Sequence, residues 1–387
     1  MKLSRSSYDV AIVGAGVIGL YLAHHLSEKM DPKRILVVDD GFLSGGASGR
    51  NGGGVRQQWE TAITIRLARE SVSAYRRFGK DFGFNPWFRQ GGYLFLSFTE
   101  DENSELKRVG AAVRAEGLPA RWLDKDQVHH MVPALNLEGL AGASYLSTDG
   151  VLLPFPVLWG LAGSLRSRGV EIRTHTRVTG FKKTGDAISG IVTAEGSASV
   201  QKAVNAAGGW SKEVNRLVGL ESPNEPTLHE ILATEPLKPF LNPMVVTLNR
   251  GIYFSQTMRG EVVGGIPAES RALFPAMPSS IEFLLKMSKE LVRLVPSLKP
   301  VGILRAWSGY YDDTPDGLPV LGEDPRLRGF YQANGFGGHG FMIAPASTRR
   351  LARMVLGEKI DLDAEALSPE RFIHGGSSPQ ADRAQLG

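Results

Sequence analysis

The stretch YDVAIVGAGVIGLYLAHHLSEKMDPKRILVVD, residues 8–39, determines which fold we expect. Residues 9–13 are a short apolar run typical of a buried strand, and residues 14–19 form the glycine turn GAGVIG. A helical pattern then continues to Glu28, and residues 34–38 are a second apolar strand that ends in an acidic pair. This order of strand, turn, helix and strand predicts the opening unit of a Rossmann-like α/β domain.

Each glycine of the turn has a physical reason if a dinucleotide lies across it. Gly14 permits the tight turn, Gly16 lets a pyrophosphate approach the backbone, and Gly19 lets the helix pack close to the strand. The N–H groups and the positive dipole end of the helix face the phosphates. Asp39 is placed to accept hydrogen bonds from a ribose. We therefore predict a dinucleotide site; a structural glycine turn in some other α/β protein is the alternative.

Composition bounds the class of protein. With 387 residues, 42% hydrophobic and 22% charged, the chain is long enough for two domains, or for one domain with an elaborate cap, and is typical of a soluble globular protein. It contains no cysteine, which excludes disulfides, thiolate-bound metals, a cysteine nucleophile and a flavin linked through a cysteine sulfur. The net charge of +4 is scattered, so no nucleic-acid footprint is present.

Two features of the sequence bear on location. The expected fold begins by residue 9, which leaves no room for a signal peptide. The longest uncharged run, residues 10–23, is 14 residues long and too short to span a bilayer. We expect a cytoplasmic protein without a transmembrane segment, with peripheral membrane association as the alternative.

A loop dense in small residues, GFLSGGASGRNGGGVR at 41–56, follows the opening unit. Glycine at this density costs backbone entropy and builds no core, which is also typical of a flexible linker. The loop directly follows the dinucleotide unit and contains Arg50 and Arg56. We therefore favour a loop that lies flat against a planar ligand while the arginines supply charge.

Four separated segments together resemble one known family. They occur in this order: residues 14–19 with Asp39, residues 45–48 (GGAS) with Arg56, residues 205–208 (NAAG), and residues 335–341 (GFGGHGF). The set is similar to the FAD-dependent amine and amino-acid oxidoreductases of the D-amino acid oxidase and glycine/sarcosine oxidase type, including the β subunits of heteromeric sarcosine oxidase and dye-linked proline dehydrogenase. The resemblance extends from residue 8 to about residue 372.

The fold class that we expect is α/β: a Rossmann-like FAD-binding domain with a β-rich antiparallel substrate (cap) domain, discontinuous in sequence. Changes between helical and strand-like periodicity give the boundaries. The FAD-binding domain is expected at residues 1–84, 150–220 and 303–372, and the cap at residues 85–149 and 221–302. Residues 373–387, rich in Gly, Ser, Pro and Gln, are expected to be a disordered tail.

The resemblance implies a flavin that lies across the interface of the two domains. Residues 14–19 would hold the pyrophosphate, Val178 would contact the adenine through its backbone, and residues 337–341 would face the N1–C2=O edge of the flavin, where helix-end N–H groups stabilise negative charge. The complete set of expected cofactor contacts is Gly14, Gly16, Val17, Ile18, Gly19, Asp39, Asp40, Ala47, Ser48, Arg50, Asn51, Gly52, Val178, Ala207, Gly208, Gly337, Gly338, His339, Gly340, Phe341 and Met342.

Three residues are expected to act at the substrate: Arg56, Tyr253 and His339. Arg56 aligns with the arginine that holds the substrate carboxylate in sarcosine oxidases, and a guanidinium fork fixes a carboxylate through two parallel hydrogen bonds. Tyr253 matches a strand that lines the substrate pocket, with plain core packing as the alternative. His339 is placed to tune the flavin ring rather than to act as a base.

The chain departs from the monomeric sarcosine oxidases at three places. Met342 stands where they have a lysine that anchors the carboxylate. Residues 261–265 (EVVGG) lack the lysine near flavin N5 that promotes reaction with oxygen, and Gly309 falls near the cysteine that links the flavin covalently. We therefore expect FAD to be bound non-covalently, and we favour a dehydrogenase over an oxidase.

The implied reaction is oxidation of an amino acid or secondary amine such as sarcosine, proline, a D-amino acid or an opine. A hydride leaves the carbon next to nitrogen for flavin N5, and water hydrolyses the resulting imine. We find no Ser/His/Asp set or metal cluster that demands other chemistry, and we expect no metal. Alternatives are hydroxy-acid or glycerol-phosphate oxidation, a non-catalytic FAD-binding subunit of a larger complex, and a nicotinamide-only dehydrogenase. If the protein oxidises an amine or amino acid, a partner subunit or a separate electron acceptor is expected to take the electrons.

Overall fold

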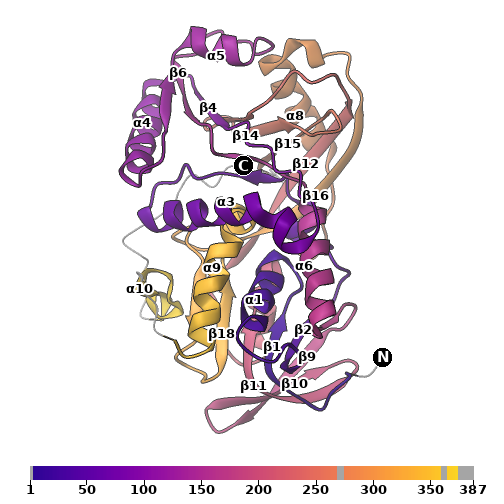
Figure 1. The fold of residues 1–387 in the computed structure, drawn as a ribbon. Helices are drawn as coiled ribbons and strands as arrows, with labels where there is room; N and C mark the ends of the chain where they lie inside the picture. Colours follow the sequence, from indigo (N-terminus) through magenta and orange to yellow (C-terminus); the bar gives the residue numbers. More distant parts are fainter. Residues whose placement is uncertain (1–2, 268–273, 359–363, 374–387) are drawn as a thin grey trace.

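Two large sheets organise the chain in the computed structural model, which describes residues 3–267, 274–358 and 364–373. Figure 1 shows one sheet in the lower half of the molecule and one in the upper half, with the long helix α3 (Ala62–Phe82) running between them. In these described ranges, no helix is both long enough and apolar enough to cross a membrane.

The lower sheet is built around the opening strand, β1. Its main path is β17-β18-β11-β1-β2-β8, and β1 pairs in parallel with both β11 and β2. The outer pairs β2–β8 and β11–β18 are also parallel, β17 is antiparallel, and the hairpin β9–β10 extends from β11. The strands are β1 (Ser7–Val13), β2 (Ile35–Val38), β8 (Glu171–Arg173), β9 (Val178–Thr184), β10 (Ala187–Thr193), β11 (Gly196–Asn205), β17 (Val320–Glu323) and β18 (Phe330–Asn334).

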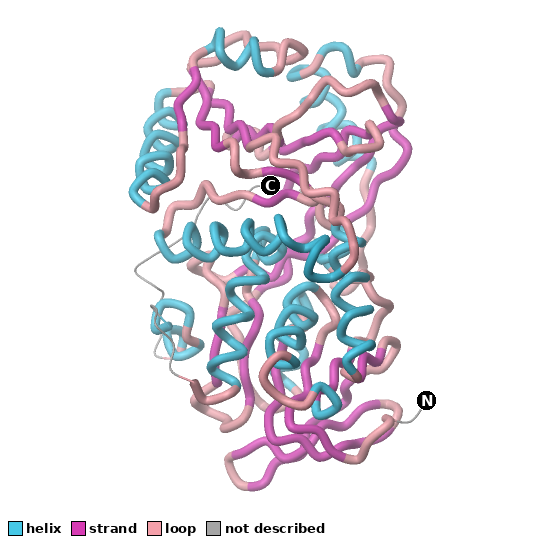
Figure 2. Tube along the Cα trace, viewed as in Figure 1, coloured by secondary structure: helices cyan, strands magenta, loops and turns pink. Residues whose placement is uncertain are grey.

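Both faces of β1 are covered, which explains why its sequence is apolar without alternation. Val10 and Ile12 point into a core shared with α1, α3, α6 and α9, whereas Ala11 and Val13 point into a second core on the side of the β9–β10 hairpin and α7. Figure 2 shows the helices standing against the lower sheet. The helices not yet given are α1 (Val17–Ser27), α6 (Pro154–Arg168), α7 (Ser211–Arg216) and α9 (Gly340–Val355).

The upper sheet forms the cap. Its order is β16-β12-β15-β14-β13-β4-β6-β5, and all neighbours are antiparallel except β13 and β4. These two strands belong to separate passages of the chain through the cap, so no hairpin forces them to be antiparallel. The strands are β4 (Tyr93–Ser97), β5 (Arg121–Leu123), β6 (Gly142–Leu146), β12 (Glu225–Pro236), β13 (Met244–Thr247), β14 (Ile252–Gln256), β15 (Glu261–Pro267) and β16 (Ile303–Asp313).

The two faces of the cap sheet pack differently because successive side chains of a strand point to opposite sides. Leu94 and Phe254 pack in a core with α8, whereas Tyr93, Phe95 and Tyr253 belong to a smaller cluster on the other face. The second face therefore presents aromatic side chains toward the lower half of the molecule. The cap helices are α4 (Glu100–Ala115), α5 (Lys125–Met131) and α8 (Ile281–Leu294).

Short elements complete the fold between the longer helices and strands. A two-stranded ladder joins β3 to β7, with Gly54 opposite Val151 and Val55 opposite Gly150. The short elements are α2 (Ala47–Arg50), β3 (Gly54–Val55), β7 (Gly150–Val151), α10 (Ala364–Leu367) and the 3₁₀ turns η1 (Pro32–Arg34), η2 (Gly208–Trp210), η3 (Pro296–Leu298), η4 (Gly337–His339) and η5 (Pro369–Phe372).

The predicted α/β fold class, with a Rossmann-like part and a β-rich cap, is confirmed. The domain boundaries stay a prediction; β16, inside the predicted range 303–372, pairs with β12 of the cap sheet. The predicted disordered tail, residues 373–387, lies outside the described residues except for Ile373.

Candidate active site

The glycine turn after β1 has no room for side chains. Gly14 has a φ of 113°, and a Cβ atom there would lie 2.2 Å from the carbonyl oxygen of Ala206. A Cβ atom on Gly19 would lie 1.9 Å from the carbonyl oxygen of Gly14, and one on Gly16 would lie 3.1 Å from Ser48 Oγ. Gly14 and Gly19 are thus required by contacts with backbone atoms, as the dinucleotide prediction expects.

The same turn brings together segments that are far apart in the sequence. The N–H of Val17, in the first turn of α1 beside Ile18, donates to Ser48 Oγ over 3.0 Å. Ala206 N donates to the carbonyl oxygen of Val13 over 2.9 Å, which places Ala207 and Gly208 beside the turn. Three of the predicted cofactor segments therefore meet at the N-terminus of one helix.

Asp39 fastens the end of β2 to this turn. Its carboxylate accepts hydrogen bonds from Ala15 N (2.7 Å) and Gly41 N (2.8 Å), and burial raises its pKa. Its main-chain oxygen accepts from Thr176 N (2.8 Å), and Asp40 forms an ion pair with Arg177, so the segment leading to Val178 runs alongside. The structure thus groups these residues, and the contacts of Asp39 with the ribose and of Val178 with the adenine stay predictions.

The glycine-rich loop is ordered by its own side chains. Arg50 Nε donates to the carbonyl oxygen of Gly45 (2.7 Å), and Arg50 Nη1 donates to that of Ser308 on β16 (3.0 Å). Trp307 Nε1 donates back to the carbonyl oxygen of Arg50 (2.7 Å). Asn51 Nδ2 donates to the carbonyl oxygen of Ser48 (2.6 Å). Arg50 therefore ties the loop to the cap sheet, which a flexible linker would not do.

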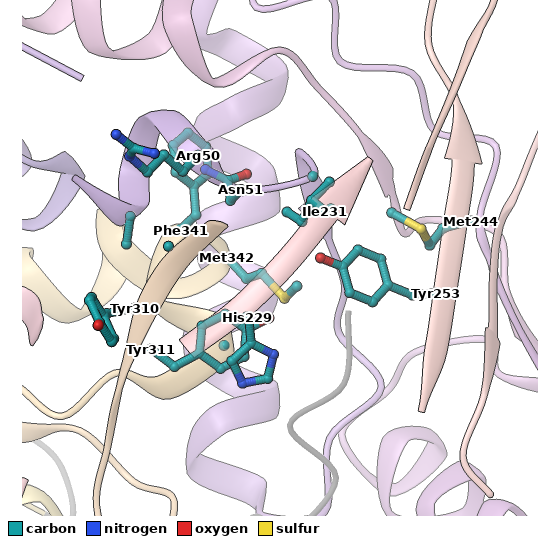
Figure 3. A pocket seen from close by; sticks show the side chains of 15 residues that line it. Arg50, Asn51, His229, Ile231, Met244, Tyr253, Tyr310, Tyr311, Phe341 and Met342 are labelled. Carbon is teal, nitrogen blue, oxygen red and sulfur yellow. The ribbon is translucent and has the colours of Figure 1, made fainter. Parts of the chain in front are cut away.

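A pocket lies where this loop, the start of α9 and the cap sheet converge (Figure 3). The lining residues that were predicted are Ala47, Arg50, Asn51, Gly52, Tyr253, Gly338, Phe341 and Met342. Those that were not predicted are Gly54, His229, Ile231, Met244, Gly309, Tyr310 and Tyr311. The described residues of the lining include no carboxylate.

The start of α9 supplies backbone donors to this region. Gly337 and Gly338 lie in the 3₁₀ turn η4, and the helix begins at Gly340. The N-cap residue of α9, His339, makes no side-chain hydrogen bond to the first turn of its helix. Gly16 at the N-cap of α1 makes none either, although Val17 N of that helix donates to Ser48 Oγ. Uncapped N–H groups at the end of a long helix stabilise negative charge. Both helix ends, with the side-chain-free glycine turn, fit the phosphates and the ring of a bound flavin dinucleotide.

Arg56, which was predicted to act at the substrate, is not among the residues that line the pocket. Its side chain is 1% exposed, and its Cζ atom lies 3.7 Å from the ring centroid of Trp59 and 5.3 Å from that of Phe95. The positive charge of Arg56 acts on Tyr311 of the lining and on His339. The guanidinium is therefore held against aromatic rings, and its charge reaches one side chain of the pocket lining.

His339 is fully buried beside Trp59, with ring centroids 4.8 Å apart. Burial and, secondly, the charge of Arg56 lower the pKa of His339 to about 3, so the imidazole is neutral near pH 7. Neither ring nitrogen has a hydrogen-bond partner among the residues that the structure describes. A neutral ring with unused nitrogens suits a contact with a bound ligand, and the role of His339 stays a prediction.

Tyr253 forms part of the cap wall. A Cβ atom on Gly52 would lie 3.2 Å from Tyr253 Cε2, and one on Gly265 would lie 2.9 Å from its hydroxyl oxygen. Burial raises the pKa of Tyr253 well above its usual value, so the hydroxyl stays protonated. The ring both packs in a hydrophobic cluster and faces the pocket, so the two interpretations of the sequence are compatible.

Sequence reasoning missed a stacked pair, His229 and Tyr311, whose ring centroids are 3.6 Å apart. Burial lowers the pKa of His229 to about 4 and raises that of Tyr311 to about 12, so both are neutral near pH 7. They lie on neighbouring strands β12 and β16, and only the register between these strands brings them together. No local sequence motif predicts such a pair.

A group of potential metal ligands lies at the C-terminal end of α1, outside the pocket lining: His24, His25 and Glu28, with ligand atoms within 4.8 Å of one another. His25 Nε2 is hydrogen-bonded to the carbonyl oxygen of Pro345 (2.9 Å). The charges of Arg168 and Arg349 act on His24 and oppose a cation there. The expected absence of a metal stays a prediction.

The fold and this site together define an FAD-dependent oxidoreductase. Residues 9–354 match the model of the family described as FAD dependent oxidoreductase, and the chain belongs to that family. The predicted FAD cofactor and the recognised family are thereby confirmed, and the chain has no cysteine through which FAD could be linked.

Curated relatives cover almost the whole chain. The β subunit of sarcosine oxidase from Rhodobacter capsulatus is 28% identical over 375 residues, 96% of this chain and 90% of the relative. Glycine oxidase from Geobacillus kaustophilus is 27% identical over 374 residues, 95% of this chain and 97% of the relative. The crystal structure of L-proline dehydrogenase from P. horikoshii is 31% identical, with a TM-score of 0.91 over 96% of this chain and 99% of that one.

Proposed function

We propose that the protein oxidises an amino acid or a secondary amine, and that Arg56 binds the carboxylate of the substrate. The observation that carries the proposal is the buried guanidinium of Arg56, which is held against Trp59 and acts through its charge on Tyr311, a residue of a pocket whose described lining has no acidic side chain. The named substrates of the relatives, sarcosine, glycine and L-proline, all combine an amine with a carboxylate.

The residues of the chain would orient and enclose the substrate. Trp59 and Phe95 fix the plane of the guanidinium, so a carboxylate can dock in one orientation. Tyr253 and Tyr311 close the cap side and exclude water from the reacting carbon. FAD bound at this site would supply the chemistry, which is acceptance of a hydride from the carbon next to nitrogen. The N-terminus of α9 stabilises the negative charge that develops in that region.

We further infer that the reduced protein passes its electrons to an acceptor other than oxygen. Met342 lines the pocket in place of the lysine that anchors the carboxylate in monomeric sarcosine oxidases. β15 carries Val263, Gly264 and Gly265 where those enzymes are expected to have the lysine near flavin N5. A compact cation beside the flavin is therefore missing from these described positions. The relative in R. capsulatus is a β subunit, which supports a partner subunit as one route for the electrons.

Anaerobic titration of the purified holoprotein tests the proposed reaction. The panel contains sarcosine, proline, D-amino acids and opines, with lactate and glycerol 3-phosphate as the hydroxy-acid and polyol alternatives, and the flavin absorbance band is followed. We expect at least one amine to bleach the band and the hydroxy compounds to leave it unchanged. Bleaching by lactate or glycerol 3-phosphate alone would support the alternative substrates. A flavin that dithionite reduces but no compound bleaches would support a non-catalytic subunit.

A further inference from the structure

Asp149 is a buried carboxyl group that faces the segment carrying Arg56. The β3–β7 ladder pairs Gly54 with Val151 and Val55 with Gly150, so the next pair of the same register is Arg56 and Asp149. Asp149 is 0% exposed. In the sequence it belongs to an ordinary Thr-Asp-Gly turn, so nothing local distinguishes it from a surface turn residue.

The carboxylate of Asp149 holds the two residues that follow Arg56. Asp149 Oδ1 accepts from Gln57 N (2.7 Å) and from Gln57 Nε2 (3.0 Å), and Asp149 Oδ2 accepts from Gln58 Nε2 (3.0 Å). Gln58 Oε1 in turn accepts from Ser144 Oγ on the cap strand β6 (2.8 Å). This network connects the segment that follows β3 to the cap strand β6.

We propose that Asp149 is the positioning residue of the carboxylate site and the buried counter-charge of Arg56, and that it takes up a proton from solvent when a carboxylate ligand binds at Arg56. The inference rests on the proposed function of Arg56. Two carboxylates that share one guanidinium in a dry site repel each other, so the entering anion favours the neutral form of Asp149. The proton converts –COO⁻ to –COOH, and the net charge around Arg56 is restored.

The surrounding groups allow Asp149 to titrate alone. Burial raises the pKa of Asp149 to about 7, against the hydrogen bonds from Gln58 and Gln57 and the charge of Arg56, which lower it. The other titratable groups that face it, Tyr93 on β4 and Tyr145 on β6, have pKa values raised by burial.

His339 and His229 stay neutral near pH 7. The pKa of His339 is about 3 and that of His229 is about 4. The histidines therefore do not account for a change of charge near pH 7 in this part of the site. Asp312, whose pKa is also raised to about 7, is distinguished from Asp149 by the variants below.

The test uses a ligand pair whose own charge is constant near neutral pH: pyrrole-2-carboxylate, an anion, and pyrrole-2-carboxamide, its neutral analogue. Their Kd values for the holoprotein are measured by perturbation of the flavin spectrum between about pH 6 and about pH 9. For the anion we expect Kd to rise above about pH 7, by up to about tenfold per pH unit, because binding requires a proton that Asp149 no longer carries. For the amide we expect a constant Kd.

Asp149→Asn should make the Kd of the anion independent of pH, because the amide cannot take up the proton. Asp312→Asn is the matched control: Asp312 is also buried, its pKa is also raised to about 7 by burial, and it accepts a backbone hydrogen bond from Gly335 N (2.6 Å). We expect the control to keep the pH dependence of the unmodified protein. A pH dependence that persists in Asp149→Asn would overturn the proposal.

A second measurement needs no variant. Binding of pyrrole-2-carboxylate by the unmodified holoprotein in weak buffer at about pH 7.5 should consume up to about one proton per site, which phenol red reports. Binding without proton uptake would overturn the role of Asp149. Equal affinity for the anion and the amide would instead show that Arg56 is not a carboxylate site, so the two failures are distinguishable. Neither readout depends on turnover.

Discussion

The two ends of the predicted FAD site are built in opposite ways. At the glycine turn after β1, the contacts are made by backbone atoms, and a Cβ atom on Gly14 or Gly19 would lie within 2.2 Å or 1.9 Å of a carbonyl oxygen. At the cap, the wall consists of side chains from different strands, such as Tyr253 on β14, His229 on β12 and Tyr311 on β16.

This difference suggests separate roles for the two ends of the site, cofactor binding at the glycine turn and substrate selection at the cap. Backbone contacts suit features common to every dinucleotide, so we expect the glycine turn to determine whether FAD is bound. Side chains on a sheet can change one at a time without altering the fold, so we expect the cap to determine which substrate is oxidised. Substitutions at the two ends should therefore separate loss of cofactor from loss of substrate affinity.

The largest effect is expected at the glycine turn. Gly14→Ala places a Cβ atom against the backbone of Ala206 at a φ of 113°, so the turn must shift and FAD should be lost. The purified variant should be colourless or insoluble. Gly163→Ala is the control, because a Cβ atom there, within α6, meets nothing within 4 Å. A yellow Gly14→Ala protein with full FAD content would contradict the prediction that this turn binds FAD.

A smaller effect is expected at the cap. Tyr253→Ala removes the ring that lies against Gly52, and KM for the reducing amine should rise roughly 10- to 200-fold while the FAD content is unchanged. Tyr253→Phe keeps the ring, and its KM should stay within about threefold of the original value. Steady-state dye reduction and the flavin absorbance measure both quantities. An alanine variant that loses FAD but keeps KM would reverse the comparison.

The smallest effect concerns the stability of the loop before α9. Asp312 accepts from Gly335 N, and burial raises its pKa from 3.8 to about 7. Because the folded state binds this proton more tightly than the unfolded state, the stabilisation is complete below about pH 4 and is lost as pH rises through about 7. Between about pH 5 and about pH 8, Tm of the unmodified protein should fall a few degrees more than Tm of Asp312→Asn.

Thermal unfolding followed by flavin fluorescence at the two pH values measures this difference. Asp149 contributes with the same sign, since its pKa is also raised to about 7. Parallel pH profiles of the two proteins would show that Asp312 has the same pKa in the folded and the unfolded chain.

The lower end of the site was predictable because its determinants are local. Residues 14–19 and Asp39 stand in a fixed order within one strand–turn–helix–strand unit, so this unit alone indicated a Rossmann-like dinucleotide-binding fold. The family and FAD were indicated by four separated segments taken together, and the fold class, the family and FAD are confirmed. Tyr253 was placed in the pocket by its similarity to a family strand, and the structure locates it there.

The rest of the site depends on strand register and on contacts between distant residues. His229 meets Tyr311 because β12 and β16 pair in one register from Glu225 to Ala233, which alternation within either strand does not determine. Asp149 reaches Gln57 across 92 residues of sequence. Buried polar contacts of this kind leave no periodic pattern in the sequence. An aspartate in a surface turn therefore cannot be distinguished from one in a buried hydrogen-bond network.

The claim that Arg56 binds the substrate carboxylate is tested most directly by matched substrates. The rate of anaerobic flavin reduction, divided by Kd, is measured for an amino acid and its decarboxylated amine, such as proline with pyrrolidine or sarcosine with dimethylamine. The unmodified protein should prefer the acid by about 100-fold or more, whereas Arg56→Ala, with its FAD intact and its KM for the acid raised, should prefer it by less than about tenfold. An undiminished preference in Arg56→Ala would contradict the account.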